Sequence, residues 1–427
     1  MKNILLLPAL LLSAGAMAQT HVTEILENVN VYVYEYPDSA SRYDHLHENA
    51  PRLSNIPDVP RFAVLGKEGK YYIGLGANIE AVADYDFGSP ISNPNLFVTS
   101  AIPMNLAPGN GAQFKLSGQQ SNVYLNVVAL PGTKDQLGAY VSVNFLGNNY
   151  TPFLQHAYLK YRGITAGYTY SLFTDAAAGP ATIDYEGPNA FTAVIHGMIG
   201  YEPVIGAKKQ WKLGIGLDMP ANSFTNAPGT ATVSQRLPDI PFYVQRNWAG
   251  GAGWLRLSGI VRNLYYRDLT RQKNVDKVGW GIKASGTSPL CGPLTVYYQA
   301  VYGKGIASYI QDLTGCGMDL MPDPSNPSSL NPVKAWAGFA SLQYTFSPRL
   351  FCTATYSHVR TYADRYTDAS APWGSQYRYA QYILGNMFYN VNSIVQLGVE
   401  YIYGRRVNYD GSQAHDNRFE AMLRVSF

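Results

Sequence analysis

The last ten residues of the chain alternate strictly between two kinds of side chain. One set is wholly apolar and consists of Phe419, Ala421, Leu423, Val425 and Phe427. The other set is mainly charged or polar and consists of Arg418, Glu420, Met422, Arg424 and Ser426. A period of two predicts a β-strand with two unlike faces. A soluble sandwich would bury the apolar face, whereas an outer-membrane barrel would turn it toward lipid and the charges toward a wet lumen.

The other end of the chain indicates export. Residues 1–18 combine a basic start at Lys2, a short apolar run, and small residues at Ala16 and Ala18. This pattern predicts a secretory signal peptide that is cleaved before Gln19. Beyond it no stretch approaches the roughly 20 apolar residues that a membrane-spanning helix needs. An exported chain of this kind is either soluble or a barrel, and its carboxy-terminal Phe427 resembles the closing strand of bacterial outer-membrane proteins.

Composition favours the barrel. Charged residues make up 14% of the chain, against about 25% in ordinary soluble domains. The 34 tyrosines suit the aromatic girdles at the two membrane interfaces. The net charge of +3, without a basic run, gives no sign of a nucleic-acid partner. The spacing of Cys291, Cys316 and Cys352 fits no metal motif, so we expect these thiols to be unpaired.

Hairpin counting predicts an all-β fold, a transmembrane antiparallel barrel of about 16 strands with short periplasmic turns and long outer loops. The strands are expected at 70–87, 113–130, 137–148, 153–162, 164–174, 194–204, 211–219, 241–249, 254–267, 277–288, 293–309, 333–346, 350–363, 376–390, 394–407 and 417–427. Residues 60–427 would form the barrel, and residues 19–59 a periplasmic extension. An Arg or Lys on the lipid face would cost about 2–4 kcal/mol at the midplane, so charged rows must face a polar, water-filled lumen.

Three motifs occur in order in the middle of the chain. They are Gln155-His-Ala-Tyr158, the run from Gly167 to Asp175 that reads GYTYSLFTD, and the run from Thr182 to Pro188 that reads TIDYEGP. Together with Gln120-Ser121 and Arg262-Asn-Leu-Tyr265, they resemble the DcaP-like trimeric porins. That resemblance implies a homotrimer in the Gram-negative outer membrane, surrounded by lipid. It also implies a third outer loop that folds into the lumen, and passage of small anionic solutes, dicarboxylates in particular.

The resemblance also suggests which residues would form the channel. The constriction loop is expected at residues 176–193, and it carries Asp184, Tyr185 and Glu186. The residues expected to line the pore are Arg256, Arg262, Lys283, Glu400, Arg406, Glu420 and Arg424. Gln119 and Asn122 stand where family members often carry Arg, which argues against strong anion selectivity. Neither an enzyme activity nor a cofactor is expected.

Other interpretations remain open. The inward charges could pair with one another to brace the wall, and the loop acids could bond to backbone amides and latch the loop. Two competing functions are a plugged transporter of the long-chain fatty-acid type, with residues 19–59 as the plug, and a structural barrel with a closed lumen. His156, His196 and His358 lack metal-ligand spacing. Three outer-loop acids are candidate Ca²⁺ ligands, namely Asp312, Asp319 and Asp323.

Overall fold

The computed structural model describes residues 30–33, 45–46, 48–51, 62–65, 70–206, 208–323, 325–363 and 375–427. The expected signal peptide and most of the expected periplasmic extension lie outside these residues. Within the described part of the chain, no helix is long and apolar enough to cross a membrane.

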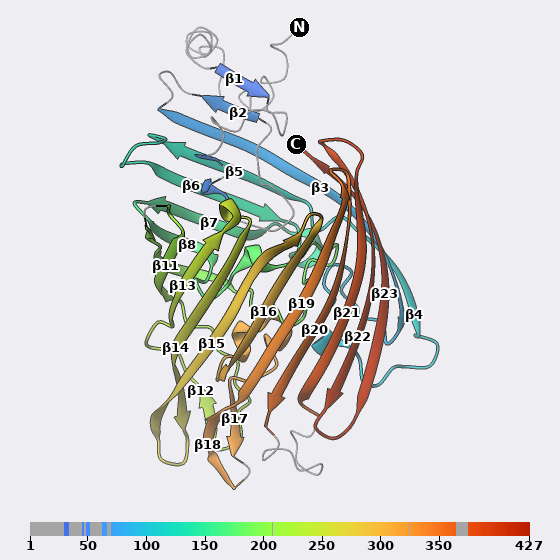
Figure 1. The fold of residues 1–427 in the computed structure, drawn as a ribbon. Helices are drawn as coiled ribbons and strands as arrows, with labels where there is room; N and C mark the ends of the chain where they lie inside the picture. The colour runs from blue at the N-terminus through green and yellow to red at the C-terminus, as the bar shows by residue number, and fades with distance from the viewer. Residues whose placement is uncertain are drawn as a thin grey trace, which may run out of the picture.

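The chain folds into a closed, antiparallel barrel of 16 strands (Figure 1). In chain order the barrel strands are β3 (Tyr71–Gly88), β4 (Ala112–Ser117) with β5 (Asn122–Ala129), β6 (Leu137–Asn144), β7 (Phe153–Tyr161), β8 (Ile164–Tyr170), β9 (Ile195–Tyr201), β11 (Trp211–Asp218), β13 (Ile240–Trp248), β14 (Gly253–Asp268), β15 (Lys273–Cys291), β16 (Leu294–Lys304), β19 (Lys334–Ser347), β20 (Leu350–Tyr362), β21 (Tyr377–Asn390), β22 (Val395–Asn408) and β23 (Gln413–Ser426). The barrel closes where Asp416–Ser426 of β23 pairs with Asn78–Gly88 of β3.

Six further strands lie outside this count. They are β1 (Asn30–Val33), β2 (Phe62–Leu65), β10 (Val204–Ile205), β12 (Thr230–Thr232), β17 (Leu320–Asp323) and β18 (Asn326–Pro332). Strand β2 pairs with β3 at Tyr72–Leu75, next to the stretch that β23 occupies, and β1 pairs with β2. The edge of β3 is therefore covered by two strands, one from each end of the chain.

The sequence-based strand assignment is confirmed to within four residues at the strand ends, apart from two larger differences. The second predicted strand is interrupted at residues 118–121, where Ser121 turns inward and its Oγ accepts a hydrogen bond from the Glu80 backbone at 2.9 Å. Strand β16 ends at Lys304, five residues before the predicted end at 309. The chain leaves the wall at Gly305, whose φ of +64° favours glycine, and continues into a buried 3-10 turn, Ala307–Tyr309.

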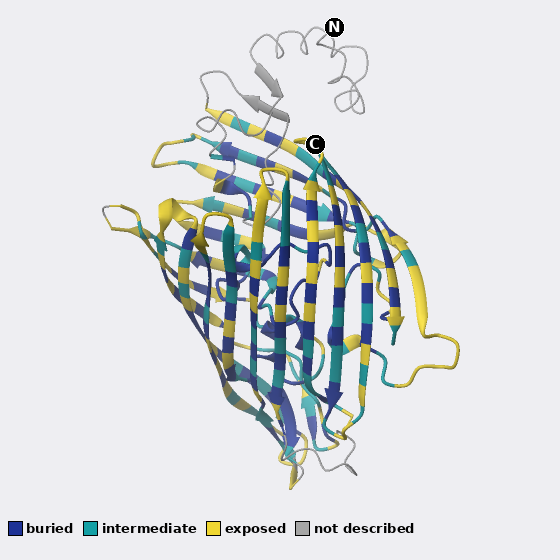
Figure 2. Cartoon of the chain, turned by 45° about the vertical axis from the view of Figure 1, so that its right-hand side comes forward, coloured by how far each residue is buried: buried dark blue, intermediate teal, exposed yellow. Residues whose placement is uncertain are grey.

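Burial alternates along most of the long strands, as the bands in Figure 2 show. On β22, for example, Leu397, Val399 and Tyr401 are exposed, whereas Glu400 and Ile402 are buried. Because a strand has a period of two, the exposed apolar set faces outward and the buried set faces the interior. The sequence predicted this division correctly.

The interior differs from the expected open, water-filled lumen, because long loops fold into it. Loop 89–111 places Ile91, Phe97 and Ile102 against the inward side chains of Leu384 and Ile402. Segments from loops 171–194 and 305–333 share a second apolar cluster with β16, β19 and β20. Burial of apolar side chains drives this packing. The polar rows of the wall are consequently covered by loops over much of the interior.

Candidate constriction of the lumen

Loop 171–194 follows β8 and is held inside the barrel first by its stem. Asp175 accepts hydrogen bonds from Trp254 Nε1 at 3.0 Å and from Ser285 Oγ at 2.7 Å. Arg256 donates to the Thr174 carbonyl at 3.1 Å, and its guanidinium lies 3.7 Å from the Asp175 carboxylate. The stem is thereby fixed to the inward faces of β14 and β15.

Lys283 holds both arms of the same loop. Its ammonium group donates to the carbonyl of Phe173 on the descending arm. It also donates to Thr192 Oγ1 on the returning arm, at 2.9 Å. The side chain is buried, with 3% of its surface exposed. Lys283 therefore joins the two arms at the base of the loop, and its charge does not face open solvent.

The tip of the loop is bound to β21 and β22. Both oxygens of the Glu400 carboxylate accept backbone amides, from Ile183 at 3.0 Å and from Asp184 at 2.9 Å. Asn386 donates from one amide group to Glu400 at 2.8 Å and to the Ala181 carbonyl at 2.7 Å. A buried carboxylate with several donors is well satisfied. Glu400 thus binds the backbone of the loop tip.

Asp184 connects the tip to a second loop. Its carboxylate accepts the amide of Phe97 at 2.9 Å, the amide of Glu186 at 3.1 Å and the hydroxyl of Tyr382 at 3.1 Å. Burial outweighs these bonds and raises the pKa of Asp184 to about 6. Burial, with the Asp184 and Asp312 carboxylates nearby, raises the pKa of Glu186 well above its usual range. Both acids therefore keep their protons to a higher pH than exposed carboxyl groups do.

Tyr185 is the exception in this packed loop, because 38% of its surface is exposed. Its hydroxyl reaches the wall formed by β6 and β7, where it accepts hydrogen bonds from Gln155 Nε2 at 2.6 Å and Asn144 Nδ2 at 3.3 Å. Tyr185 therefore bridges the loop and this wall, while part of its side chain stays exposed. The loop tip and this wall are therefore joined through one aromatic side chain, at the place where the sequence predicts a constriction.

Strands β23 and β3 carry a network of ion pairs. Arg418 lies 2.6 Å from Asp86 and 3.6 Å from Glu420, and it donates to the Asn93 carbonyl at 2.9 Å. Arg424 donates to Glu80 at 2.8 Å. A buried charge that is both paired and hydrogen-bonded is held in one geometry. These residues brace the wall and hold loop 89–111.

The remaining predicted pore residues also contact loops. Arg262 lies 3.0 Å from both Asp239 and Asp319, with all three side chains buried. It thereby joins two outer loops. Arg406, which is half-buried, donates to the Ser100 carbonyl and, at 2.9 Å, to Asn408. Every predicted pore residue thus lies on the inward face, and each makes a hydrogen bond or ion pair.

Sequence reasoning missed the uncharged residues that seat the returning arm. Ser357 donates to Asn189 Oδ1 at 2.6 Å and accepts the Ala190 amide at 3.0 Å. Gln299 Oε1 accepts Thr192 Oγ1 at 2.9 Å. The only feature of the sequence that could have identified Ser357 and Gln299 is their position on the inward face of β20 and β16. The predicted pore residues are all charged, although uncharged side chains make many of the contacts between the loop and the wall.

Two of the three candidate Ca²⁺ ligands anchor loops, and the third, Asp323, accepts hydrogen bonds from Ser325 and Asn331 nearby in the chain. Asp312 accepts Thr99 Oγ1 and the Tyr377 hydroxyl, both at 2.6 Å. Asp319 accepts a hydrogen bond from Arg262, and it accepts a second one from the Ser308 amide at 3.1 Å. Within the described ranges, no group of three or more His, Cys, Asp or Glu residues could hold a metal ion. Cys291, Cys316 and Cys352 are free thiols.

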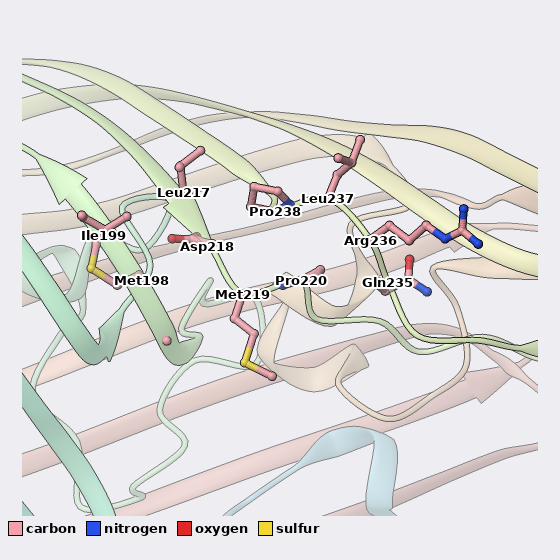
Figure 3. A pocket seen from close by; sticks show the side chains of 11 residues that line it. Met198, Ile199, Leu217, Asp218, Met219, Pro220, Gln235, Arg236, Leu237 and Pro238 are labelled. Carbon is pink, nitrogen blue, oxygen red and sulfur yellow. The ribbon is translucent and has the colours of Figure 1, made fainter.

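A cavity of about 340 Å³ lies away from the loop tip, at the ends of β9 and β11 and along loop 219–239 (Figure 3). Its apolar lining includes Met198, Leu217, Met219 and Leu237, and Asp218 is the acidic group among the lining residues. Asp218 accepts the hydroxyl of Ser171, at the start of the constriction loop. This cavity therefore borders the structure that holds the loop stem.

Comparison with solved structures gives the fold independent support. The outer-membrane channel DcaP of Acinetobacter baumannii superposes with a TM-score of 0.70 at 20% identity, covering 84% of this chain and 99% of that one. An anion-selective porin from Comamonas acidovorans gives 0.53 at 10% identity, covering 84% of this chain and all of that one. OmpT, an outer membrane protein of Vibrio cholerae, gives 0.51 at 10% identity, covering 84% and 99%.

No protein-family model matches the sequence, and no curated protein does. The structural likeness nevertheless covers 84% of this chain and 99% of the DcaP chain. The resemblance that the three motifs suggested is therefore confirmed at the level of the fold: this chain has the barrel fold of the DcaP outer-membrane channel.

Proposed function

We propose that this protein is an outer-membrane porin through which small hydrophilic solutes diffuse passively. The observation that carries the proposal is the exposed Tyr185 within a closed barrel. Its hydroxyl accepts hydrogen bonds from Asn144 and Gln155 on the opposite wall, while part of the ring stays exposed, which supports a path for water between the loop and that wall. A solute crossing the barrel would pass beside this side chain.

The wall opposite Tyr185 is polar and largely uncharged. Its inward side chains include Asn122, Ser142, Asn144 and Gln155. Amide and hydroxyl groups exchange hydrogen bonds with a hydrated solute and do not attract one sign of charge. Such a lining suits uncharged or weakly charged solutes.

The basic residues expected to attract anions are engaged elsewhere. Arg262 lies between two carboxylates, and Lys283 is buried against the loop backbone. Selectivity follows from charges that line the path. We therefore propose weak charge selectivity. The alternative proposal is transport of dicarboxylates, which the resemblance implies. It would require anion selectivity, the property for which the Comamonas porin is named.

We further propose that the protein resides in the outer membrane as a homotrimer. The outward faces of β3, β5 and β6 present a continuous apolar surface. It includes Leu75, Val123, Leu125 and Val141, each with more than a third of its surface exposed. Such a surface suits either lipid or the same surface of a neighbouring copy.

Single-channel recording of a Tyr185→Ala variant tests the channel proposal. Removal of the ring is expected to raise the conductance, because Tyr185 occupies part of the open cross-section. The matched control is Tyr389→Ala, since Tyr389 lies on the outward face of β21. Equal conductance in the variant, the control and the unaltered protein would show that solute does not pass Tyr185.

A further inference from the structure

A segment near the amino terminus lies inside the barrel. Residues 45–46 and 48–49 are helical, and the Ala50 amide donates to the Leu46 carbonyl at 3.1 Å. Leu46, Asn49 and Ala50 are all buried, with at most 4% of their surfaces exposed. Ala50 packs in one cluster with Tyr124, Tyr140 and Tyr158. We refer to the described residues 45–46 and 48–51 as the amino-terminal segment.

Asn49 and Asn126 form the centre of its binding site. Asn49 Nδ2 donates to Asn126 Oδ1 at 2.7 Å, and Asn126 Nδ2 donates to the Leu46 carbonyl, also at 2.7 Å. Asn49 Nδ2 lies 3.1 Å from the Ala139 carbonyl as well. One inward amide on β5 thus recognises both a side chain and the backbone of the segment.

Strand β7 completes the site. The Tyr158 hydroxyl donates to the Asn49 carbonyl at 2.6 Å, and Lys160 Nζ donates to the same oxygen at 3.0 Å. The rings of Tyr124, Tyr140 and Tyr158 stack in a row, with centroids 5.9 Å and 5.5 Å apart. The row is rigid because the rings lie on three neighbouring strands. It gives the segment a fixed surface to rest on.

Gly138 makes the space that Asn49 fills. A Cβ atom at this position of β6 would lie 2.0 Å from Asn49 Oδ1, so the Asn49 side chain would have to move to make room for it. The backbone of Gly138 requires no positive φ, so a strand residue such as Val fits the local conformation. The site can therefore be blocked without altering the strand.

The segment enters at the end of the barrel with the short turns. Gly132 lies in the turn between β5 and β6, and a Cβ there would lie 3.6 Å from His45 Nε2. Tyr185 contacts the same wall further along, through Asn144 and Gln155. The two obstructions therefore follow one another along a single wall.

We propose that the inward face of β5, β6 and β7 is a binding site for the amino-terminal segment of the same chain, and that the bound segment plugs the periplasmic half of the lumen. The inference rests on the proposed channel function. It adds a second barrier below Tyr185, held by hydrogen bonds that come mainly from uncharged groups. Release of the segment would widen the path without any change in the constriction loop.

Disulfide trapping tests the position of the segment. In a background with Cys291, Cys316 and Cys352 replaced by Ser, the pair Asn49→Cys and Gly138→Cys is expected to cross-link on mild oxidation, because the Asn49 Cγ lies 2.6 Å from the Cβ position of residue 138. The matched control pairs Asn49→Cys with Gly385→Cys, where β21 has open space. Absence of the 49–138 cross-link in folded protein would overturn the proposed site.

Single-channel conductance tests the plug. Gly138→Val should displace Asn49 and raise the conductance roughly twofold, whereas Gly385→Val should leave it unchanged. A cross-linked 49–138 channel should stay at the lower level. An unchanged Gly138→Val conductance alongside efficient 49–138 cross-linking would overturn the plug.

The two proposals fail in distinguishable ways. If the cross-link forms but no variant conducts, the segment is correctly placed and the channel function is wrong. If channels open but the cross-link never forms, the channel stands and the amino-terminal site is wrong.

Discussion

The Glu400 carboxylate lies 2.9 Å from the backbone nitrogen of Asp184. This contact joins β22 to the tip of the constriction loop, and the second Glu400 oxygen accepts the neighbouring amide of Ile183. A wall residue thus binds the loop backbone where a pore-lining role was expected. The geometry separates residues that hold the loop from Tyr185, which faces the open space.

Glu400→Ala should loosen the loop tip. The change leaves the Ile183 and Asp184 amides without acceptors, and each buried unsatisfied group costs about 1–3 kcal/mol. We expect noisier single-channel currents and faster proteolysis within residues 176–193. Asp276→Asn, at an exposed position of β15, is the control. If the Glu400→Ala variant shows neither noisier currents nor faster proteolysis, Glu400 does not hold the loop tip.

Lys283→Met distinguishes a structural charge from a selectivity charge. The substitution keeps much of the length of the side chain but removes the donors to Phe173 and Thr192. We expect lower thermal stability together with an unchanged reversal potential, because the buried ammonium does not face the path. Lys334→Met, at an exposed position, serves as the comparison. A clear shift of the reversal potential toward cations would assign Lys283 to the filter.

Arg262→Ala should destabilise the outer loops. Removing one member of a buried ion-pair cluster costs about 3–5 kcal/mol, because the other charges remain buried. Asp239 and Asp319 would both lose their guanidinium partner. Heat-induced unfolding on gels should occur at a lower temperature, and Arg262→Lys should recover part of the loss. Unfolding at the wild-type temperature would show that the cluster contributes little.

The loop tip should be held more firmly as the pH falls. Burial raises the pKa of Asp184 to about 6 from its ordinary 3.8, so the folded loop binds this proton more tightly than the unfolded chain does. The contribution of Asp184 to stability therefore grows as the pH falls from above 6 toward 4, and is absent above that window. Limited proteolysis of the loop at pH 5 and pH 8 measures it. Asp184→Asn should remove this part of the pH dependence; a dependence identical to that of the unaltered protein would contradict it.

The wall of the barrel was predictable, and the path of the loops was not. Alternation in segments such as residues 394–407 fixes strand faces directly, because each step reverses the side chain. The same alternation placed apolar Leu384 and Ile402 inside, against the expectation of a polar lumen. Apolar side chains at these two inward positions indicate that an apolar partner covers them, and in the structure this partner is Phe97 with its neighbours.

The loop acids show a second limit of the sequence. The motif identified Asp184, Tyr185 and Glu186 together, but neighbouring residues of an irregular loop have no fixed period. The structure buries Asp184 and Glu186 and exposes Tyr185. The amino-terminal segment was equally hidden, because its partners Asn126 and Tyr158 lie about 80 and 110 residues away along the chain. Such contacts follow from the closure of the barrel, which no local pattern encodes.

The most direct measurement of the central claim is the reversal potential of the purified protein in a planar bilayer under a KCl gradient. We predict discrete channel openings with a reversal potential near zero, because uncharged Asn144 and Gln155 form the wall beside Tyr185 and the predicted basic pore residues are held by hydrogen bonds or ion pairs. A strongly anion-selective reversal potential would mean that the buried basic residues reach the path after all. Absence of channel openings would contradict the porin itself.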